Sequence, residues 1–334
     1  AARTGWPVVL VVDARGMAAS AAALVQGYAG FRDDVGLAGV IFNRVGGPGH
    51  AALLSEACAP LGIPVLGALP RRDDLVLPDR HLGLVQAAEH PDLEGLLERA
   101  AAWAGEHLDL DALADLARPA KAGAFVEVDS PDVLPPLGQR IAVARDEAFA
   151  FAYPFVLDDW RAAGAEITAF SPLAGEAPDP SADAVYLPGG YPELHAGRIA
   201  ASRGFLIGLH AAAERGATVY GECGGYMVLG QGLEDAAGER HAMAGLLPVV
   251  TSFRQPRLHL GYRAARLEAD GPLGPAGAGF RGHEFHFARL VGDEGTAPLF
   301  RCRDARARDL GRVGARSGRV FGSFLHLVDR ADGG

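Results

Sequence analysis

Cys223 is the residue whose surroundings most clearly indicate chemistry. A run of β-branched and aromatic residues ends at Tyr220, and residues 224–230 are typical of a helix start. Glycines on both sides of the cysteine allow a sharp strand-to-helix turn that lifts its side chain clear of a sheet. The free N–H groups at a helix N-terminus stabilise a thiolate at such a position. We therefore predict that Cys223 is a nucleophile, and the alternative is a buried structural cysteine.

A cysteine nucleophile needs a general base and donors for the oxyanion. His326 is the candidate base, because it follows a short strand and a Gly-Ser turn near the end of the sequence, where an α/β sheet can carry a catalytic histidine. The backbone N–H groups of Gly224 and of Gly189 or Gly190 are candidate oxyanion donors, since successive glycines let a backbone approach a ligand closely.

Two further histidines, His283 and His286, lie close together in the sequence. In a strand, residues three apart point to opposite faces. These two histidines are therefore poor co-ligands for one metal ion, and each is as well explained by a structural role.

The first third of the sequence predicts a parallel sheet. Apolar runs at 7–13, 37–42 and 63–69 alternate with helical segments at 17–28 and 50–59. Such runs suit strands buried on both faces and joined by right-handed crossovers. Ligands bind these sheets at the carboxyl ends of the strands, where Asp13, Asn43, Pro70 and Arg71 fall. Taken singly, Asp13 could also cap a helix and Asn43 could belong to a turn.

A segment with four prolines divides the chain. We expect a first domain at 1–118, which ends in a helix at 92–117, then a linker at 119–138 and a second domain at 139–334. The second domain opens with strands at 140–145, 167–170 and 184–187, with a helix at 153–163. It continues with shorter strands at 258–267, 279–290, 310–316 and 319–321. The predicted class is α/β, with two doubly wound domains.

Composition excludes several classes of protein. Of the 334 residues, 49% are hydrophobic and 22% are charged, with a net charge of −10. This acidic balance, without a basic patch, argues against nucleic acid as a partner. No apolar run is long enough to cross a membrane, and no signal peptide is visible. The three cysteines are widely spaced with no CxxC pair, which predicts a reducing, cytoplasmic location.

The sequence has no phosphate loop of the form GxxxxGK[ST]. Its single lysine, Lys121, lies outside any glycine-rich strand-to-helix turn. The chain also opens almost at once on a buried-type strand, without a methionine. We therefore expect that an N-terminal piece with the first strand and its loop is absent, and that this chain binds ATP poorly or not at all.

Several motifs together resemble the glutamine-dependent a,c-diamide synthases of cobalamin biosynthesis, which act on cobyrinic or hydrogenobyrinic acid. They are YLPGGYPEL at 186–194, GECGGYM at 221–227, LGYR at 260–263, GHEFH at 282–286 and GSFLH at 322–326. VVLVVDARGMA at 8–18 and GVIFNR at 39–44 match the ATP-binding half of the same family. The resemblance implies a truncated P-loop-type domain similar to dethiobiotin synthetase, followed by a class I glutamine amidotransferase domain.

The resemblance also implies two reactions. In the first, Cys223 attacks the side-chain amide of glutamine, His326 activates the thiol, and ammonia is released. In the second, ATP with Mg²⁺ phosphorylates the a and c acetate carboxylates of the corrinoid, and ammonia displaces the phosphate. The family relationship would make Asp13 a magnesium ligand and would place Asn43 with the 70–71 loop beside the adenine.

One departure from the family concerns the histidine. Family members often carry a second histidine where Val328 stands, and a valine cannot orient an imidazole. Asp329, Glu222 or a backbone carbonyl could do so, or a third member is lacking.

Other functions stay open at this point. They are amidation of a related tetrapyrrole of the nickel-sirohydrochlorin type, a stand-alone cysteine amidohydrolase or peptidase, and a scaffold without activity. The sequence also leaves the oligomeric state open, with a homodimer as one possibility.

Overall fold

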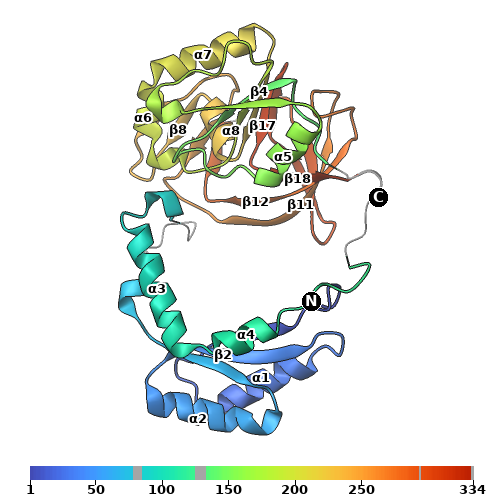
Figure 1. Cartoon of the computed structure of the whole chain (residues 1–334). Helices are drawn as coiled ribbons and strands as arrows, with labels where there is room; N and C mark the ends of the chain where they lie inside the picture. The colour runs from blue at the N-terminus through green and yellow to red at the C-terminus, as the bar shows by residue number, and fades with distance from the viewer. Residues whose placement is uncertain (78–84, 125–132, 293–294, 332–334) are drawn as a thin grey trace. The chain divides into compact units, whose positions relative to one another are not determined.

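The computed structural model of the chain divides into two compact units, Ala1–Asp129 and Ser130–Gly334. It describes residues 1–77, 85–124, 133–292 and 295–331 (Figure 1). The division between the units falls inside the linker expected at 119–138, of which residues 125–132 lie outside the described part. Within the described residues, no helix combines the length and the apolar character needed to span a membrane.

The first unit is built on a parallel sheet with the strand order β1-β2-β3. Its helices, including short 3-10 helices marked η, alternate with the strands as predicted. In chain order the elements are β1 (Val8–Asp13), α1 (Ser20–Gly30), β2 (Leu37–Val45), α2 (Pro48–Cys58), η1 (Ala59–Leu61), β3 (Val65–Pro70), η2 (Asp73–Leu75), η3 (Ala87–Glu89), α3 (Leu93–His107) and α4 (Leu110–Asp115).

Strand β1 is less buried than its sequence predicts. Val12 is 3% exposed, but its neighbour Val11 is 60% exposed. β1 lies at the edge of the described sheet, and α1 and α2 pack on the face that carries Val12. The expectation of a strand buried on both faces is therefore wrong for β1, because an apolar run records the side chains and not how many layers cover them.

The helix expected at 92–117 is two helices, α3 and α4. The chain leaves α3 at Leu108, which forms a β-bridge with Gly67 of β3. Asp109 then donates its N–H to the carbonyl of Leu66 at 2.8 Å, and its carboxylate accepts from the N–H of Ala112 as the N-cap of α4. A contact with the sheet thus interrupts a pattern that is helical throughout.

The second unit is centred on a six-stranded sheet with the order β16-β17-β7-β6-β4-β5. All its neighbouring strands are parallel except β16, which runs antiparallel to β17. The strands and helices of this layer are β4 (Arg140–Ala144), α5 (Pro154–Ala162), β5 (Glu166–Phe170), η4 (Pro172–Ala174), β6 (Ala184–Leu187), η5 (Pro192–Leu194), α6 (Ala196–Ala201), α7 (Arg203–Glu214), β7 (Thr218–Glu222), α8 (Gly224–Leu229), β16 (Ala315–Ser317) and β17 (Val320–Ser323).

Two antiparallel sheets complete this unit. The five-stranded sheet has the order β15-β14-β11-β12-β18, and the four-stranded sheet has the order β13-β10-β8-β9. Their strands are β8 (Gly232–Glu234), β9 (Arg240–Ala242), β10 (Val250–Ser252), β11 (His259–Leu267), β12 (Gly279–His286), β13 (Arg289–Gly292), β14 (Phe300–Asp304), β15 (Asp309–Val313) and β18 (His326–Arg330). The strands expected at 279–290 and 310–316 are each divided between two sheets. Gly314, with φ of 74°, makes the second division.

The core of the second unit has two parts, one on each face of the six-stranded sheet. One part contains residues of α6, α7 and α8 together with alternate residues of the central strands. The other joins α5 to the five-stranded sheet through residues such as Trp160, Phe280 and Phe300. Figure 1 shows α8 at the end of the central strands, where α6 and α7 lie to one side. The carboxyl ends of β6, β7 and β17 therefore meet beside β18, and this edge carries Cys223 and His326.

Candidate active site

Cys223 lies at the predicted turn between β7 and α8. Its backbone has φ of 49° and ψ of −100°, which is strained for a residue with a Cβ. The N–H of Cys223 donates to the carbonyl of Ser323 at 2.8 Å, so that β17 holds the strained residue in place. The turn also brings α8 close to the end of β6, because a Cβ on Gly225 would lie 1.9 Å from the carbonyl oxygen of Leu187.

We expect the substitution Gly225→Ala to disrupt this turn. The added methyl meets backbone, which cannot move aside as a flexible side chain can, so the free energy of unfolding should fall by about 3 kcal/mol. Urea unfolding and an assay of thiol reactivity at Cys223 measure the two effects. Gly271→Ala is the control, since nothing lies within 4 Å of its added Cβ. Equal stability of the two variants would contradict the prediction.

His326 is buried against Cys223 at the start of β18, with 4% of its surface exposed. Burial alone would lower the pKa of His326. The charge of the Cys223 thiolate, its hydrogen bond and the carboxylate of Glu222 act in the opposite direction and raise this pKa to about 10. The structure therefore places a protonated imidazole in hydrogen-bond contact with the sulfur of Cys223, an arrangement that favours the reactive form of a cysteine nucleophile.

Cys302 is a buried cysteine whose surroundings differ from those of Cys223. Cys302 of β14 is also buried, but here burial first, and then the charge of Glu284, raises the pKa of the thiol to about 12. Such a thiol stays protonated and inert. The neighbouring imidazolium thus distinguishes Cys223 from a structural cysteine.

In the wild type, we expect the imidazole of His326 to stay protonated at neutral pH. In Cys223→Ser, the imidazole should lose its proton at a lower pH than in the wild type. The substitution removes the thiolate charge that raises the pKa of His326, while the burial that lowers it remains. Ring-carbon NMR shifts recorded against pH measure the midpoint. Cys58→Ser, a change at a buried cysteine of the first unit, is the control. An unchanged midpoint in Cys223→Ser would show that the two side chains do not interact.

Glu222 supplies the carboxylate that faces His326. Its Oε1 lies 3.4 Å from Nδ1 of His326, and only 2% of the residue is exposed. Two tyrosine hydroxyls donate to the carboxylate, Tyr186 at 3.0 Å and Tyr220 at 3.1 Å, and the N–H of Leu327 donates at 3.1 Å. Glu222 is one of the candidates named from the sequence, and its carboxylate is in contact with the imidazole.

The two tyrosines are held as neutral donors. Burial first, and then the charge of Glu222, raises the pKa of Tyr186 and of Tyr220 well above the usual value. A buried carboxylate is stable only when its lone pairs are satisfied. These donors satisfy the buried carboxylate of Glu222 beside His326.

His283 is a residue of this site that sequence reasoning missed. Its ring is stacked on that of His326, with 4.8 Å between centroids and 4° between planes, and the hydroxyl of Tyr153 contacts its Nε2. Burial first, and then the charge of His326, lowers the pKa of His283. His286 instead stacks on Phe324 at 3.9 Å, so the two histidines do face opposite ways. The GHEFH motif marked both residues, but a motif does not say which one faces Cys223.

The predicted oxyanion glycines gather at the same place. A Cβ on Gly189 would lie 2.5 Å from Cε1 of His326, and a Cβ on Gly224 would lie 2.9 Å from the nitrogen of Gly190. Backbone from the β6 loop and from the start of α8 therefore lines the space beside Cys223. The three glycines remain candidates for the oxyanion role.

The predicted nucleotide residues lie together in the first unit. Asp13 pairs in register with Asn43, and Pro70 ends the next strand along the same edge. Asp13 forms ion pairs with Arg15 at 3.2 Å and with Arg44 at 3.1 Å. The hydrogen bond from the backbone of Arg15 first, and then the charges of both arginines, lowers the pKa of Asp13. An ionised carboxylate beside two arginines fits a metal-bound nucleotide in charge.

Arg71 is also at this edge. Its N–H donates to the carbonyl of Val45, and its guanidinium pairs with Asp73 at 2.8 Å on an exposed surface. The structure thus brings Asp13, Asn43 and the 70–71 loop together, as the parallel topology requires. Their roles in binding remain predictions.

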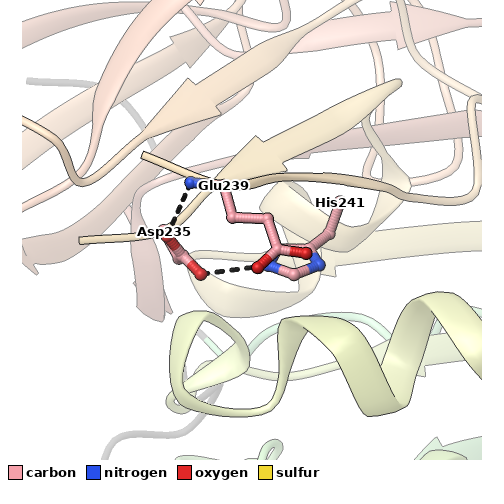
Figure 2. Close-up of side chains that lie close together, drawn as sticks. All are labelled: Asp235, Glu239 and His241. Atoms are coloured by element: carbon pink, nitrogen blue, oxygen red, sulfur yellow. Dashed lines mark hydrogen bonds and ion pairs between the residues drawn. The ribbon is translucent and has the colours of Figure 1, made fainter. Parts of the chain in front are cut away.

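A second group of potential metal ligands lies in the β8–β9 hairpin (Figure 2). Asp235 accepts from the N–H of Glu239 at 2.9 Å, and its other oxygen lies 3.0 Å from Nε2 of His241. These bonds close the hairpin turn by themselves. The group is explained as a turn and indicates no ion.

Comparison with known proteins matches each of the two units to a protein family. Residues 140–332 match the family model described as the CobB/CobQ-like glutamine amidotransferase domain, and residues 3–85 match the CobQ/CobB/MinD/ParA nucleotide binding domain. Hydrogenobyrinate a,c-diamide synthase from Brucella abortus biovar 1 (strain 9-941) is 57% identical over 97% of this chain and 73% of its own length. The enzyme of the same name from Sinorhizobium sp is 52% identical over 99% of this chain and 75% of its own length. The one from Rhodobacter capsulatus is 53% identical over 97% of this chain and 73% of its own length.

Proposed function

Because the chain belongs to the family of hydrogenobyrinate a,c-diamide synthases, we propose that it converts the a and c acetate carboxylates of hydrogenobyrinic acid into amides. It is an amidating ligase that takes its nitrogen from glutamine, and its first unit is a nucleotide-binding domain that suits the use of ATP. The observation that carries the amidotransferase half is the buried contact of Cys223 with His326 and of His326 with Glu222.

In the glutaminase half, the sulfur of Cys223 attacks the side-chain amide carbon of glutamine. Backbone N–H groups of Gly224 and of Gly189 or Gly190 stabilise the oxyanion that forms. The imidazolium of His326 then donates its proton to the departing nitrogen, and ammonia leaves a glutamyl thioester on the sulfur. His326, now neutral, takes a proton from water, which attacks the thioester and releases glutamate.

Glu222 acts through His326 in this scheme. Its carboxylate faces Nδ1, so Nε2 is the nitrogen left to serve the sulfur and the leaving nitrogen. A negative charge fixed beside the imidazole also stabilises the imidazolium that donates its proton in the first half of the cycle and forms again in the second. Glu222 is therefore proposed as the positioning member of a Cys-His-Glu triad, in the place where Val328 cannot serve.

We propose that the first unit carries out the ATP-dependent ligase reaction. Asp13 would hold Mg²⁺, and Asn43 with Pro70 and Arg71 would border the adenine of ATP. Bound ATP supplies a phosphoryl group that makes a carboxylate oxygen a leaving group. Ammonia then replaces that oxygen and leaves an amide. The support for this assignment is the shared edge of β1, β2 and β3 on which these residues lie.

The decisive experiment offers the protein several acceptors. Purified protein with ATP, Mg²⁺ and glutamine is incubated with hydrogenobyrinic acid, with cobyrinic acid or with nickel-sirohydrochlorin, and product mass is recorded with glutamate release. We expect two amidations of hydrogenobyrinic acid, coupled to two glutamates. Glutamate release without amidation of any acceptor would instead favour a stand-alone amidohydrolase.

A further inference from the structure

A large pocket in the second unit lies apart from the Cys223 site. It has a volume of about 760 Å³ and is bounded by strands β11 to β15 and by the aromatic rings of Tyr226 and Phe324. Along β12, His283 faces His326, whereas Glu284 and His286 line the pocket, as the alternation of a strand requires. The described residues that line it include neither Cys223 nor His326.

The pocket is basic in an acidic protein. Its described lining contains four arginines, Arg257, Arg263, Arg289 and Arg312, and one carboxylate, Glu284. The whole chain carries a net charge of −10. We call this site the arginine pocket. A local excess of guanidinium groups against the overall charge attracts anionic ligands to this place.

The floor of the arginine pocket is a neutralised, ordered network. Glu284 pairs with Arg263, and their side chains are 14% and 11% exposed. His286 donates from Nδ1 to the carbonyl of Ala288 at 3.1 Å and stacks on His259 with 4.7 Å between centroids. These partners fix the floor, so the ligand charge is left to the exposed arginines at the rim.

Two rim arginines are suited to bind a ligand. Arg289 donates to the neutral amide oxygen of Gln255 at 3.0 Å and has no ion pair with the described residues, so among them its charge is available. Arg257 is exposed at the start of the segment that leads into β11. Arg312, by contrast, is paired with Glu268 at 3.1 Å. Planar guanidinium groups bind carboxylates through two parallel hydrogen bonds.

The walls are apolar, so the ligand should be amphipathic. Leu290 is 39% exposed and Leu310 is 43% exposed at the pocket, and Phe324 closes one side. A volume of this size accepts a large organic molecule, not a single small anion. The combination fits an apolar body that carries several carboxylates.

We propose that the arginine pocket binds the carboxylate-rich tetrapyrrole on the amidotransferase unit, with Arg257 and Arg289 holding peripheral carboxylates. This inference rests on the proposed function, because that function supplies a ligand with an apolar ring and many carboxylates. It adds a second place of contact for the acceptor, outside the nucleotide-binding unit.

The test is the double variant R257Q/R289Q in the complete protein. Binding of hydrogenobyrinic acid, followed by its visible absorbance, should weaken about tenfold or more, since two charge-assisted bonds are lost. The glutamine KM and the rate of glutamate release should stay unchanged. The matched control is R203Q, an exposed arginine at the start of α7, which should bind as the wild type does. Citrate and inorganic phosphate, added as competitors, show whether any small anion suffices.

The possible outcomes distinguish a failure of the arginine-pocket proposal from a failure of the proposed amidation reaction. Wild-type amidation of hydrogenobyrinic acid with unchanged affinity in R257Q/R289Q would overturn the arginine pocket alone. A rise in the glutamine KM would also overturn it, because the pocket would then serve glutamine. Displacement of the corrinoid by millimolar phosphate alone would reduce the site to a general anion site. Failure of the wild type to amidate any corrinoid would remove the proposed function itself.

Discussion

Replacement of Cys223 by serine is expected to abolish glutamine-dependent amidation while ammonia-dependent amidation survives. Serine is nearly isosteric and can keep the hydrogen bond from the backbone N–H to Ser323. A hydroxyl in this position is a far weaker nucleophile than a thiolate, so glutamate release should fall by roughly 10³-fold or more. Glutamate release and product mass, with glutamine or ammonium chloride as the nitrogen source, measure the two activities.

Two controls make this result specific. Cys302→Ser changes a buried thiol whose pKa burial raises to about 12, and it should leave the rate of glutamate release nearly unchanged if the protein folds. Thermal unfolding of each variant tests folding directly. Retention of more than about a tenth of the wild-type rate in Cys223→Ser would rule out this residue as the nucleophile.

The substitution Glu222→Gln should give the second largest effect. It keeps the shape of the side chain and removes its charge, so His326 loses the partner 3.4 Å from its Nδ1. The hydroxyls of Tyr186 and Tyr220 would also face an amide, whose NH₂ group cannot accept. We expect kcat for glutamate release to fall by roughly 10²- to 10⁴-fold with little change in KM, as when the orienting acid of a triad is neutralised.

A pH profile distinguishes positioning from a merely structural role. The carboxylate of Glu222 raises the pKa of His326, so its removal lowers that pKa. The imidazolium is lost as pH rises through this pKa, and the alkaline limb of kcat/KM should therefore move to lower pH in Glu222→Gln. Glu234→Gln, which removes a carboxylate in the β8–β10 region, is the control. An alkaline limb at the wild-type position would show that Glu222 does not act on His326.

The local sequence predicted much of the candidate site. Glycines around Cys223 predicted its strand-to-helix turn, because the backbone conformation of a single residue depends on its near neighbours. The edge shared by Asp13 and Asn43 followed from parallel strands, whose carboxyl ends must lie on one side. The period of apolar residues placed most strands and helices of both units within a few residues.

Other features needed long-range contacts. The bridge between Leu108 and Gly67 divides a helix that the sequence shows as continuous. His283 reaches His326 because β12 and β18 pair in one register, and a shift by one residue would turn the ring to the other face. No local pattern records that register.

The sequence by itself determined the candidate nucleophile, its turn and the succession of strands and helices, since these depend on residue type and short-range periodicity. Only the tertiary structure decided which carboxylate faces His326, which histidine stacks on it, and that four arginines surround one pocket. The physical reason is that side chains far apart in the chain meet through strand pairing and layer packing, where direction and distance are set by the whole fold.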